Sequence, residues 1–331
     1  MRDPLCGSGK VWPDSMNYEP TMAGRRVAYV LLTIMALCFA GTWVAGKVAV
    51  RTMPPMALAA GRFTVASVCL WVWARLRGVV GKGLTRKDLP LVLSMGLTAV
   101  AGYNIFFLIG LKPAPASDGA IIVPGLAPAL TAILSAAILK ERIRRPAVWG
   151  FLVALVGMVF VMRPGGPVDK FRLTGDILFL FAAVCWAVYS AVGKSATQRF
   201  GAIDATLYGT IAGTLILYPL AVLERPWEAM AAAPAGAWVG LFYLGTFGTV
   251  VAFVCFYEGI RRLGAARASS FILLVPVFGV ALTVSMLGER LAPSTIAGGI
   301  LVLVGLWLVQ RQGLHRAESY AGTSSTQMDR R

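Results

Sequence analysis

The sequence predicts an all-α membrane protein with ten transmembrane helices arranged as two inverted five-helix repeats. Three observations support this prediction: the composition, the length of the apolar runs, and an internal duplication. Hydrophobic residues make up 57% of the 331-residue chain and charged residues only 14%. Mean hydropathy is +0.72, which is more apolar than a typical soluble protein. We therefore expect most of the chain to lie in a lipid bilayer.

Ten apolar stretches are long enough to span the membrane. A helix of about 20 apolar residues crosses a hydrocarbon core of ~30 Å. The runs are continuous, which favours helices over barrel strands, because barrel strands alternate in polarity and are about half as long. In chain order the predicted spans are 27–49, 55–76, 89–111, 115–139, 147–163, 175–196, 204–223, 237–260, 265–287 and 294–310.

Lysine and arginine residues between the spans predict the orientation. One side of the membrane collects Arg25, Arg26, Arg75, Arg77, Lys82, Arg86, Lys87, Lys140, Arg142, Arg144, Arg145, Arg199, Arg261, Arg262, Arg267, Arg311 and Arg316. The other side collects only Arg51, Lys112, Arg163, Lys170, Arg172, Arg225 and Arg290. The positive-inside rule makes the first side cytoplasmic. Both termini are then cytoplasmic, which requires an even number of spans, and ten spans meet this requirement.

The two halves of the chain repeat each other. Cys38 and Lys47 recur 147 residues later as Cys185 and Lys194, within similar local sequences. Each half contains five predicted spans, an odd number, so the second half is expected to cross the membrane in the opposite sense. The predicted organisation is a disordered tail at 1–24, with Met22 as an alternative translation start, repeats at 25–163 and 175–311, and a cytoplasmic tail at 312–331.

Motifs in both halves resemble a known family. Residues 265–269, 276–278 and 287–291 resemble the second half of an EamA-type transporter of the drug/metabolite transporter (DMT) superfamily, and residues 126–129 and 139–143 are the first-half counterparts. The resemblance covers residues 25–311. It implies a ten-helix inner-membrane carrier, commonly an exporter of amino acids or other small metabolites. It does not identify the substrate.

Arg62 is the most informative side chain for binding. It lies about seven residues into the second span, ~10 Å along the helix, and a charge at that depth normally faces a polar cavity or a partner. It is interpreted either as an attractor for a substrate carboxylate or as a structural or snorkelling residue. Aromatic and polar residues near the middle of three other spans would complete a small-molecule site, with helix packing as the alternative for each: Trp43, Tyr103, Asn104, Trp186, Tyr189 and Ser190.

Two further pairs of residues occupy equivalent positions in the halves. Lys47 and Lys194 lie near opposite membrane faces and are interpreted either as gating residues or as lysines that snorkel to the interface. Pro128 and Pro276 lie within predicted spans, where each removes a backbone donor and favours a kink. They are expected to act either as hinges for alternating access or as fixed kinks.

Several chemistries find no support in the sequence. Asp118, Asp176 and the other carboxylates in spans lie near helix ends, so any proton coupling would use a residue nearer a mouth or the substrate itself. His315 is the only histidine, and the cysteines show no paired spacing, so no metal site and no cofactor are expected. The net charge of +16 comes from short clusters between spans, which does not favour nucleic acid as a partner.

The predicted function is a secondary transporter that exports small metabolites, with amino acids among the candidates, by alternating access. The expected partners are a small-molecule substrate and membrane lipid. An importer or exchanger is the alternative within transport. An intramembrane enzyme or a lipid-handling scaffold is a less favoured class, because no nucleophile, base or metal ligands cluster within the spans.

Overall fold

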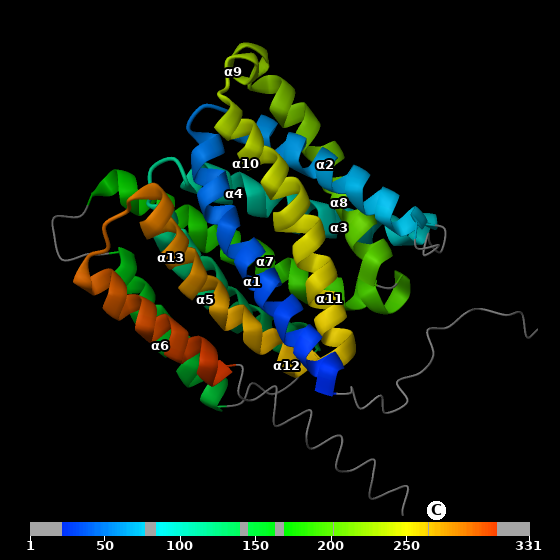
Figure 1. Ribbon diagram of the computed structural model, residues 1–331. Helices are drawn as coiled ribbons and strands as arrows, with labels where there is room; N and C mark the ends of the chain where they lie inside the picture. Colours follow the sequence, from blue (N-terminus) through cyan, green and yellow to red (C-terminus); the bar gives the residue numbers. More distant parts are fainter. Residues whose placement is uncertain are drawn as a thin grey trace, which may run out of the picture.

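The computed structural model describes residues 22–76, 84–139, 145–162, 169–200, 202–263 and 265–309. All regular secondary structure in these residues is helical (Figure 1), which confirms the all-α prediction. Seven helices in this part of the chain are long and apolar enough to cross a membrane: Gly24–Val50, Pro55–Leu76, Arg86–Gly110, Lys170–Gly193, Asp204–Leu223, Ala235–Leu263 and Arg267–Leu287. Val148–Met162 and Pro293–Val309 are shorter apolar helices. The ten-span count and the inversion of the halves stay predictions.

The helices of the first half coincide with the predicted spans to within a few residues. α1 and α2 are uninterrupted, whereas the third span is built from several short elements that include a π-helical segment. The predicted tails 1–24 and 312–331 fall outside the described residues, except for residues 22–24. The elements are α1 (Met22–Val50), α2 (Pro55–Leu76), η1 (Arg86–Asp88), α3 (Leu89–Met95), the π-helix η2 (Gly96–Gly102), α4 (Tyr103–Gly110), α5 (Ala116–Leu139) and α6 (Arg145–Met162).

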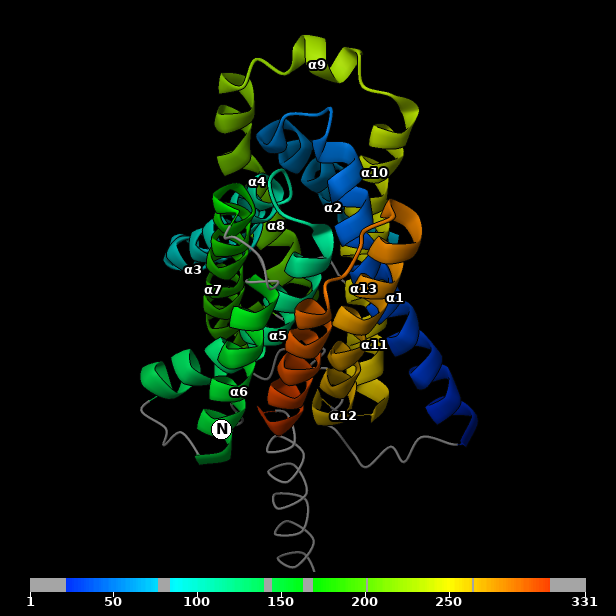
Figure 2. The ribbon, with the colours of Figure 1, turned by 90° about the vertical axis from the view of Figure 1, so that its left-hand side faces the viewer.

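The helices of the second half follow the same order. A second π-helical segment interrupts the third long helix of this half, at the place equivalent to the first one. The short helix α9 joins α8 to α10 at one pole of the molecule (Figure 2), and we call this pole the α9 end. The elements are α7 (Lys170–Phe200), α8 (Ala202–Leu223), α9 (Trp227–Ala231), α10 (Ala235–Gly245), the π-helix η3 (Thr246–Val251), α11 (Ala252–Leu263), α12 (Ala265–Ser270), η4 (Phe271–Leu273), α13 (Leu274–Leu287) and the final helix (Pro293–Val309).

Helices of the two halves pack against each other in exchanged pairs. α1 packs on α13, α10 and α11, and its counterpart α7 packs on α5, α4 and η2. α2 packs on its own counterpart, α8. The Ala114 carbonyl accepts a hydrogen bond from Lys47, near the last residue of α1, and Ala114 also packs on Gly175, near the first residue of α7. α1 and α7 therefore run in opposite directions.

Glycines allow two of these helices to approach closely. A Cβ atom placed on Gly157 of α6 would lie 2.6 Å from the carbonyl oxygen of Gly298 in the final helix. A Cβ atom on Gly150 would lie 2.7 Å from the carbonyl oxygen of Gly305. Small residues permit such backbone contact between membrane helices. These two glycine pairs hold the last helices of the two halves together.

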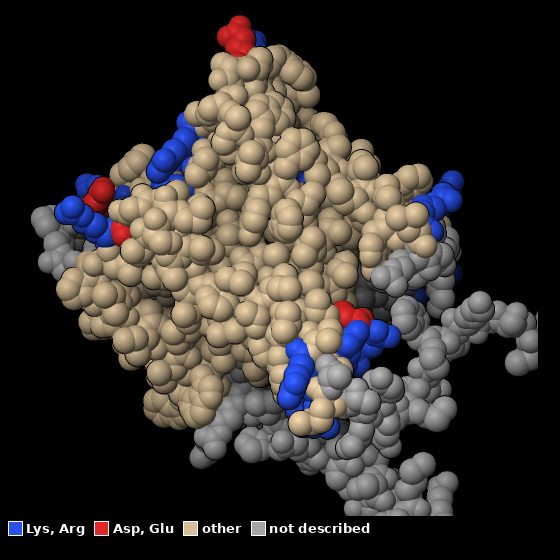
Figure 3. All heavy atoms as spheres, in the orientation of Figure 1, with Lys and Arg blue, Asp and Glu red and all other residues tan. Residues whose placement is uncertain are grey.

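The outer surface is apolar over its middle and charged at its margins. Figure 3 shows one face on which Lys, Arg, Asp and Glu gather at the edges and leave the central belt without charge. Large apolar side chains are exposed in the described part of the chain, including Trp149 (65%), Leu215 (65%) and Val239 (67%). A soluble protein rarely exposes so much contiguous apolar surface. The surface is that of a protein surrounded by lipid.

Candidate functional site

Arg62 lies in α2 and is buried between the two halves, with 5% of its surface exposed. Its Nη1 donates a hydrogen bond of 3.0 Å to Asn104 Oδ1, and its Nη2 donates one of 3.3 Å to Thr249 Oγ1. The guanidinium carbon lies 4.6 Å from the ring centroid of Phe63. Nε has no hydrogen-bond partner among the described residues. Arg62 is thus held by one neutral group from each half.

The π-helical segments place both of these partners. Asn104 follows η2, and its Nδ2 donates to the carbonyl oxygens of Val100 (2.9 Å) and Ala99 (3.2 Å). Thr249 lies within η3, and its hydroxyl donates to the carbonyl oxygen of Leu244 at 3.0 Å. A π turn disturbs the ordinary backbone ladder, and buried carbonyls need donors. Each side chain satisfies a carbonyl of its own helix and presents an oxygen to Arg62.

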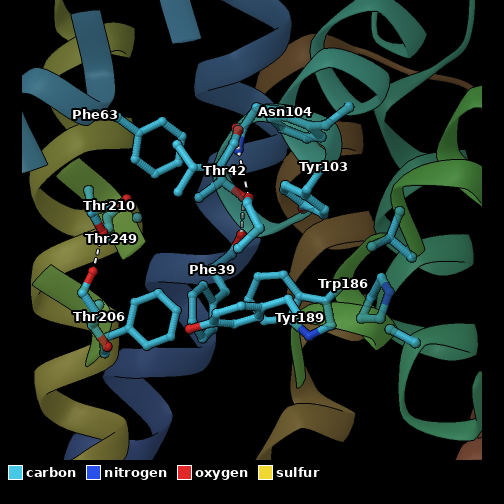
Figure 4. Close-up of a pocket in the computed structure, with 18 of the residues that line it drawn as sticks. Phe39, Thr42, Phe63, Tyr103, Asn104, Trp186, Tyr189, Thr206, Thr210 and Thr249 are labelled. Atoms are coloured by element: carbon cyan, nitrogen blue, oxygen red, sulfur yellow. Dashed lines mark hydrogen bonds between the residues drawn. The ribbon is translucent and has the colours of Figure 1, made fainter. Parts of the chain in front are cut away.

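A cavity of about 170 Å³ opens beside Arg62. A cavity needs roughly 10–15 Å³ to hold one water molecule. The space beside Arg62 therefore admits a molecule with on the order of ten non-hydrogen atoms. Arg62 is the only charged residue among the described residues that line it. Aromatic and aliphatic side chains form most of the wall, and the neutral polar groups include threonine hydroxyls and one amide; several of these residues are labelled in Figure 4. The aromatic, threonine and asparagine residues of the lining are Phe39, Thr42, Trp43, Phe63, Tyr103, Asn104, Phe107, Trp186, Tyr189, Thr206, Thr210, Thr249 and Phe253.

The aromatic rings support one another across helices. The Tyr103 ring of α4 lies 5.4 Å from that of Trp186 in α7, and Trp186 lies 5.6 Å from Tyr189, measured between centroids. Trp43 of α1 meets Phe107 edge-to-face at 5.0 Å. Such pairs are worth about 0.5–1.5 kcal/mol beyond their buried area. The wall is therefore held in shape by its own packing.

The structure brings most of the predicted site residues together. Six of the seven predicted substrate contacts line this single cavity: Trp43, Arg62, Tyr103, Asn104, Trp186 and Tyr189. Ser190 is not among the lining residues, and its hydroxyl donates to the carbonyl oxygen of Trp186, at 2.8 Å, within α7. Their roles in binding stay predictions.

The predicted hinges and gates have different surroundings. Pro128 lines the cavity and lies within α5, which stays helical through it. Pro276 lies in the first turn of α13, directly after the 3-10 turn η4. Lys47 Nζ donates to the carbonyl oxygens of Leu111 (2.5 Å) and Ala114 (2.7 Å). Lys194 belongs to α7, but its side chain lies outside the described residues. Hinge and gate functions stay predictions.

Several lining residues were not predicted from the sequence. Thr249 and Phe253 come from η3 and α11, and Thr206 and Thr210 come from α8. The sequence could have predicted that α8 has a polar face. Threonine recurs there at a four-residue spacing, at Thr206, Thr210 and Thr214, which places the three side chains on one face of the helix. All three are buried.

Comparison with known proteins gives the family. The family model described as the EamA-like transporter family matches the chain twice, over residues 26–163 and 173–311. The chain belongs to the EamA-like transporter family. This EamA-like transporter is therefore a multi-pass membrane protein, and the family predicted from the motifs is confirmed.

Named relatives of this EamA-like transporter include proteins described as exporters. An uncharacterized transporter of Archaeoglobus fulgidus is 30% identical over 285 residues, covering 86% of this chain and 99% of that protein. A probable terminal-alkyne amino-acid exporter of Streptantibioticus cattleyicolor is 28% identical, covering 86% and 94%. A probable amino-acid metabolite efflux pump of Salmonella typhimurium is 24% identical, covering 84% and 93%. A crystal structure that is 21% identical, with a TM-score of 0.57, covers 87% of this chain and 98% of its own, and it shares the fold.

Proposed function

We propose that this EamA-like transporter is a secondary carrier of the cytoplasmic membrane that exports small metabolites bearing a carboxylate, amino acids among them. The observation that carries the proposal is Arg62, a buried cation on the wall of a cavity whose described lining residues include no Asp or Glu. A charge buried at membrane depth needs a partner. A substrate carboxylate supplies one through charge-assisted hydrogen bonds, and the aromatic wall contacts the apolar part of the substrate.

Ten spans in two inverted repeats place this site at the seam between the halves. The proposal is supported by the exchanged packing of α1 on α13 and α7 on α5, by the opposite directions of α1 and α7, and by the two successive matches to the family model. Inverted repeats commonly bind substrate near the bilayer midplane and move against each other around it. Asn104 and Thr249, one from each half, bring both halves into contact with Arg62.

Export is supported by the names of relatives, and the orientation of the chain is supported by charge. Two relatives are named as an exporter and an efflux pump. The distribution of Lys and Arg favours cytoplasmic termini. A carrier is favoured over an intramembrane enzyme because the family is one of transporters and because the described lining residues hold no Asp, Glu, His or Cys that could act as a catalytic base or thiol.

Counterflow in proteoliposomes tests the proposal. The full chain is reconstituted, and efflux of radiolabelled amino acids is compared with efflux of the amines that lack only the carboxylate. We expect saturable flux of the carboxylates and little flux of the amines. No saturable flux of any carboxylate across a broad panel would overturn the proposal.

A pair of arginine variants isolates the charge. Arg62→Gln removes hydrogen bonds to a charged group, worth about 1.5–3 kcal/mol, so we expect transport efficiency to fall about 10- to 150-fold. Arg62→Lys keeps the positive charge but lacks the planar guanidinium, so its transport efficiency should lie between those of the parent protein and Arg62→Gln. Arg75→Gln is the matched control, because Arg75 is exposed on the same helix beside Trp71. If Arg62→Gln and Arg75→Gln reduce transport efficiency equally, Arg62 is not a substrate-binding residue.

A further inference from the structure

Two buried carboxyl groups face each other where α5 meets α7. Asp118 lies in the first turn of α5, Asp176 lies near the start of α7, and both have 0% of their surface exposed. Each is an electrostatic neighbour of the other. Neither lines the cavity. Gly119, the neighbour of Asp118, packs directly against Trp43 of the cavity wall. The pair therefore lies just behind the cavity, at the seam between the halves.

Arg172 forms a salt bridge with only one of the two carboxyl groups, that of Asp118. Arg172 Nε and Nη2 both contact Asp118 Oδ2, at 2.8 Å and 2.7 Å, and Nη2 also reaches the carbonyl oxygen of Val161 at 3.4 Å. Asp118 Oδ1 and both carboxyl oxygens of Asp176 have no hydrogen-bond partner in the part of the chain that the structure describes. Three buried acceptor atoms are thus left without a donor.

The other charged groups near the pair are engaged elsewhere. Lys47 and Glu289 both contribute to the local electrostatics. Lys47 donates to the carbonyls of Leu111 and Ala114, and Glu289 accepts from two backbone N–H groups at the start of α5. Arg172 is the cation that acts on Asp176, and both of its contacts with the pair go to Asp118 Oδ2. An ionised Asp176 would therefore place a second negative charge beside Asp118 without a hydrogen-bonded cation of its own among the described residues.

An uncompensated carboxylate in such a place is strongly unfavourable. Burying an ion without a partner costs several kcal/mol, and two carboxylates that share a site retain one proton between them. A proton on Asp176 removes the excess charge and creates a donor that can serve Asp118 Oδ1. One proton on Asp176 would therefore give a hydrogen-bond partner to an oxygen atom of each residue.

We propose that Asp118 and Asp176 form a proton-binding site, in which Asp176 carries one proton and shares it with Asp118 while α5 and α7 are in contact. Because the two residues come from opposite halves, separating α5 from α7 exposes both carboxyl groups to water. Asp176 then ionises, and its proton passes to water. This link between proton release and opening of the α9 end rests on the proposed alternating access, whereas the proton site itself does not.

Infrared spectroscopy of the purified full-length protein tests the site without any substrate. The carbonyl stretch of a protonated carboxyl group is recorded at neutral pH and through an alkaline titration. We expect a band that shifts in heavy water, disappears at alkaline pH, and is lost in Asp176→Asn. In Asp118→Asn, Asp176 is free to pair with Arg172, so the band should also be lost. Glu228→Gln, an exposed carboxylate in α9, is the control and should keep it.

The outcomes separate the proton site from transport. Absence of the band in the parent protein at neutral pH, or its persistence in Asp176→Asn, overturns the site. The parent titration decides the matter even where Asp176→Asn does not fold. Flux assays then address the link: we expect the pH dependence of efflux to be lost in Asp176→Asn. A band that behaves as expected in a protein without measurable flux supports the proton site and counts against the proposed transport function only.

Discussion

Glu289 holds the start of α5 to the end of α13, and removing its carboxylate should loosen the α9 end. Oε1 accepts a hydrogen bond of 2.7 Å from the Ala116 N–H, and Oε2 accepts one of 2.9 Å from the Ser117 N–H. Glu224 does the same for α2, accepting from the N–H groups of Met56 (2.9 Å) and Ala57 (3.1 Å). Each glutamate follows a helix and caps the first turn of a helix from the other half.

The size of the effect follows from the lost cap. Losing an N-cap costs about 0.5–2 kcal/mol, and losing a negative charge at a helix N-terminus costs a further 0.3–1 kcal/mol or so. Glu289→Ala should therefore destabilise the contact between Glu289 and the start of α5 by about 1–3 kcal/mol, which shifts the equilibrium for opening this contact about 5- to 150-fold. Glu289→Gln keeps one acceptor and should give the smaller shift.

Labelling of a buried reporter cysteine measures the opening. Met53, in the connection between α1 and α2, is 1% exposed, so Met53→Cys in a background without the native cysteines reacts with a maleimide only when this end opens. We expect Glu289→Ala to raise the labelling rate by the factor given above. Glu228→Ala removes an exposed carboxylate of α9 and should leave the rate unchanged. An unchanged rate and an unchanged thermal unfolding midpoint in Glu289→Ala would refute the capping argument.

Three further outcomes are expected. Thr249→Val removes one hydrogen bond to Arg62, worth about 0.6–1.7 kcal/mol between membrane helices, so the substrate concentration for half-maximal flux should rise about 3- to 20-fold; an unchanged value contradicts the role of Thr249. Gly157→Ala places a Cβ atom 2.6 Å from Gly298 O and should cost about 1–3 kcal/mol in thermal unfolding, whereas at Gly193 the nearest atom lies at 3.9 Å and Gly193→Ala should be nearly neutral. Lys47→Met leaves the Leu111 and Ala114 carbonyls unsatisfied, which should lower stability by about 1–3 kcal/mol in the same assay; no loss means that water replaces the lysine.

The helix positions were predictable because burial in lipid needs long apolar runs. Each predicted span coincides with helical residues, and the largest differences are at the ends of α1 and α7 and reach about five residues, where helical hydrogen bonding continues past the apolar run. The π-helical segments were not predictable, because a π turn leaves no hydrophobic signature and depends on the side chains that satisfy its freed carbonyls.

The site was half visible in the sequence. Arg62 and Asn104 stand out because strongly polar side chains are rare in apolar spans. Thr249 does not stand out, because a threonine in a helix usually bonds a carbonyl of its own turn. Ser190 makes the same kind of bond within its own helix but does not line the cavity. A single sequence cannot tell these two hydroxyls apart, since only the packing of α2 against η3 brings Thr249 to Arg62.

The two halves of the chain have different residues at one matching position that lines the cavity. α2 begins at Pro55 and α8 at Ala202, so Arg62 and Gly209 are each the eighth residue of matching helices, and both line the cavity. Arg62 brings a guanidinium to the cavity, whereas Gly209 brings no side chain, and the neighbouring residues of α8 that line the cavity, Thr206 and Thr210, bring neutral hydroxyls. The described lining residues therefore offer one cationic group. A dicarboxylate would find a cationic partner for only one of its two carboxylates, whereas a molecule with one carboxylate and an apolar tail would match Arg62 and the aromatic rings.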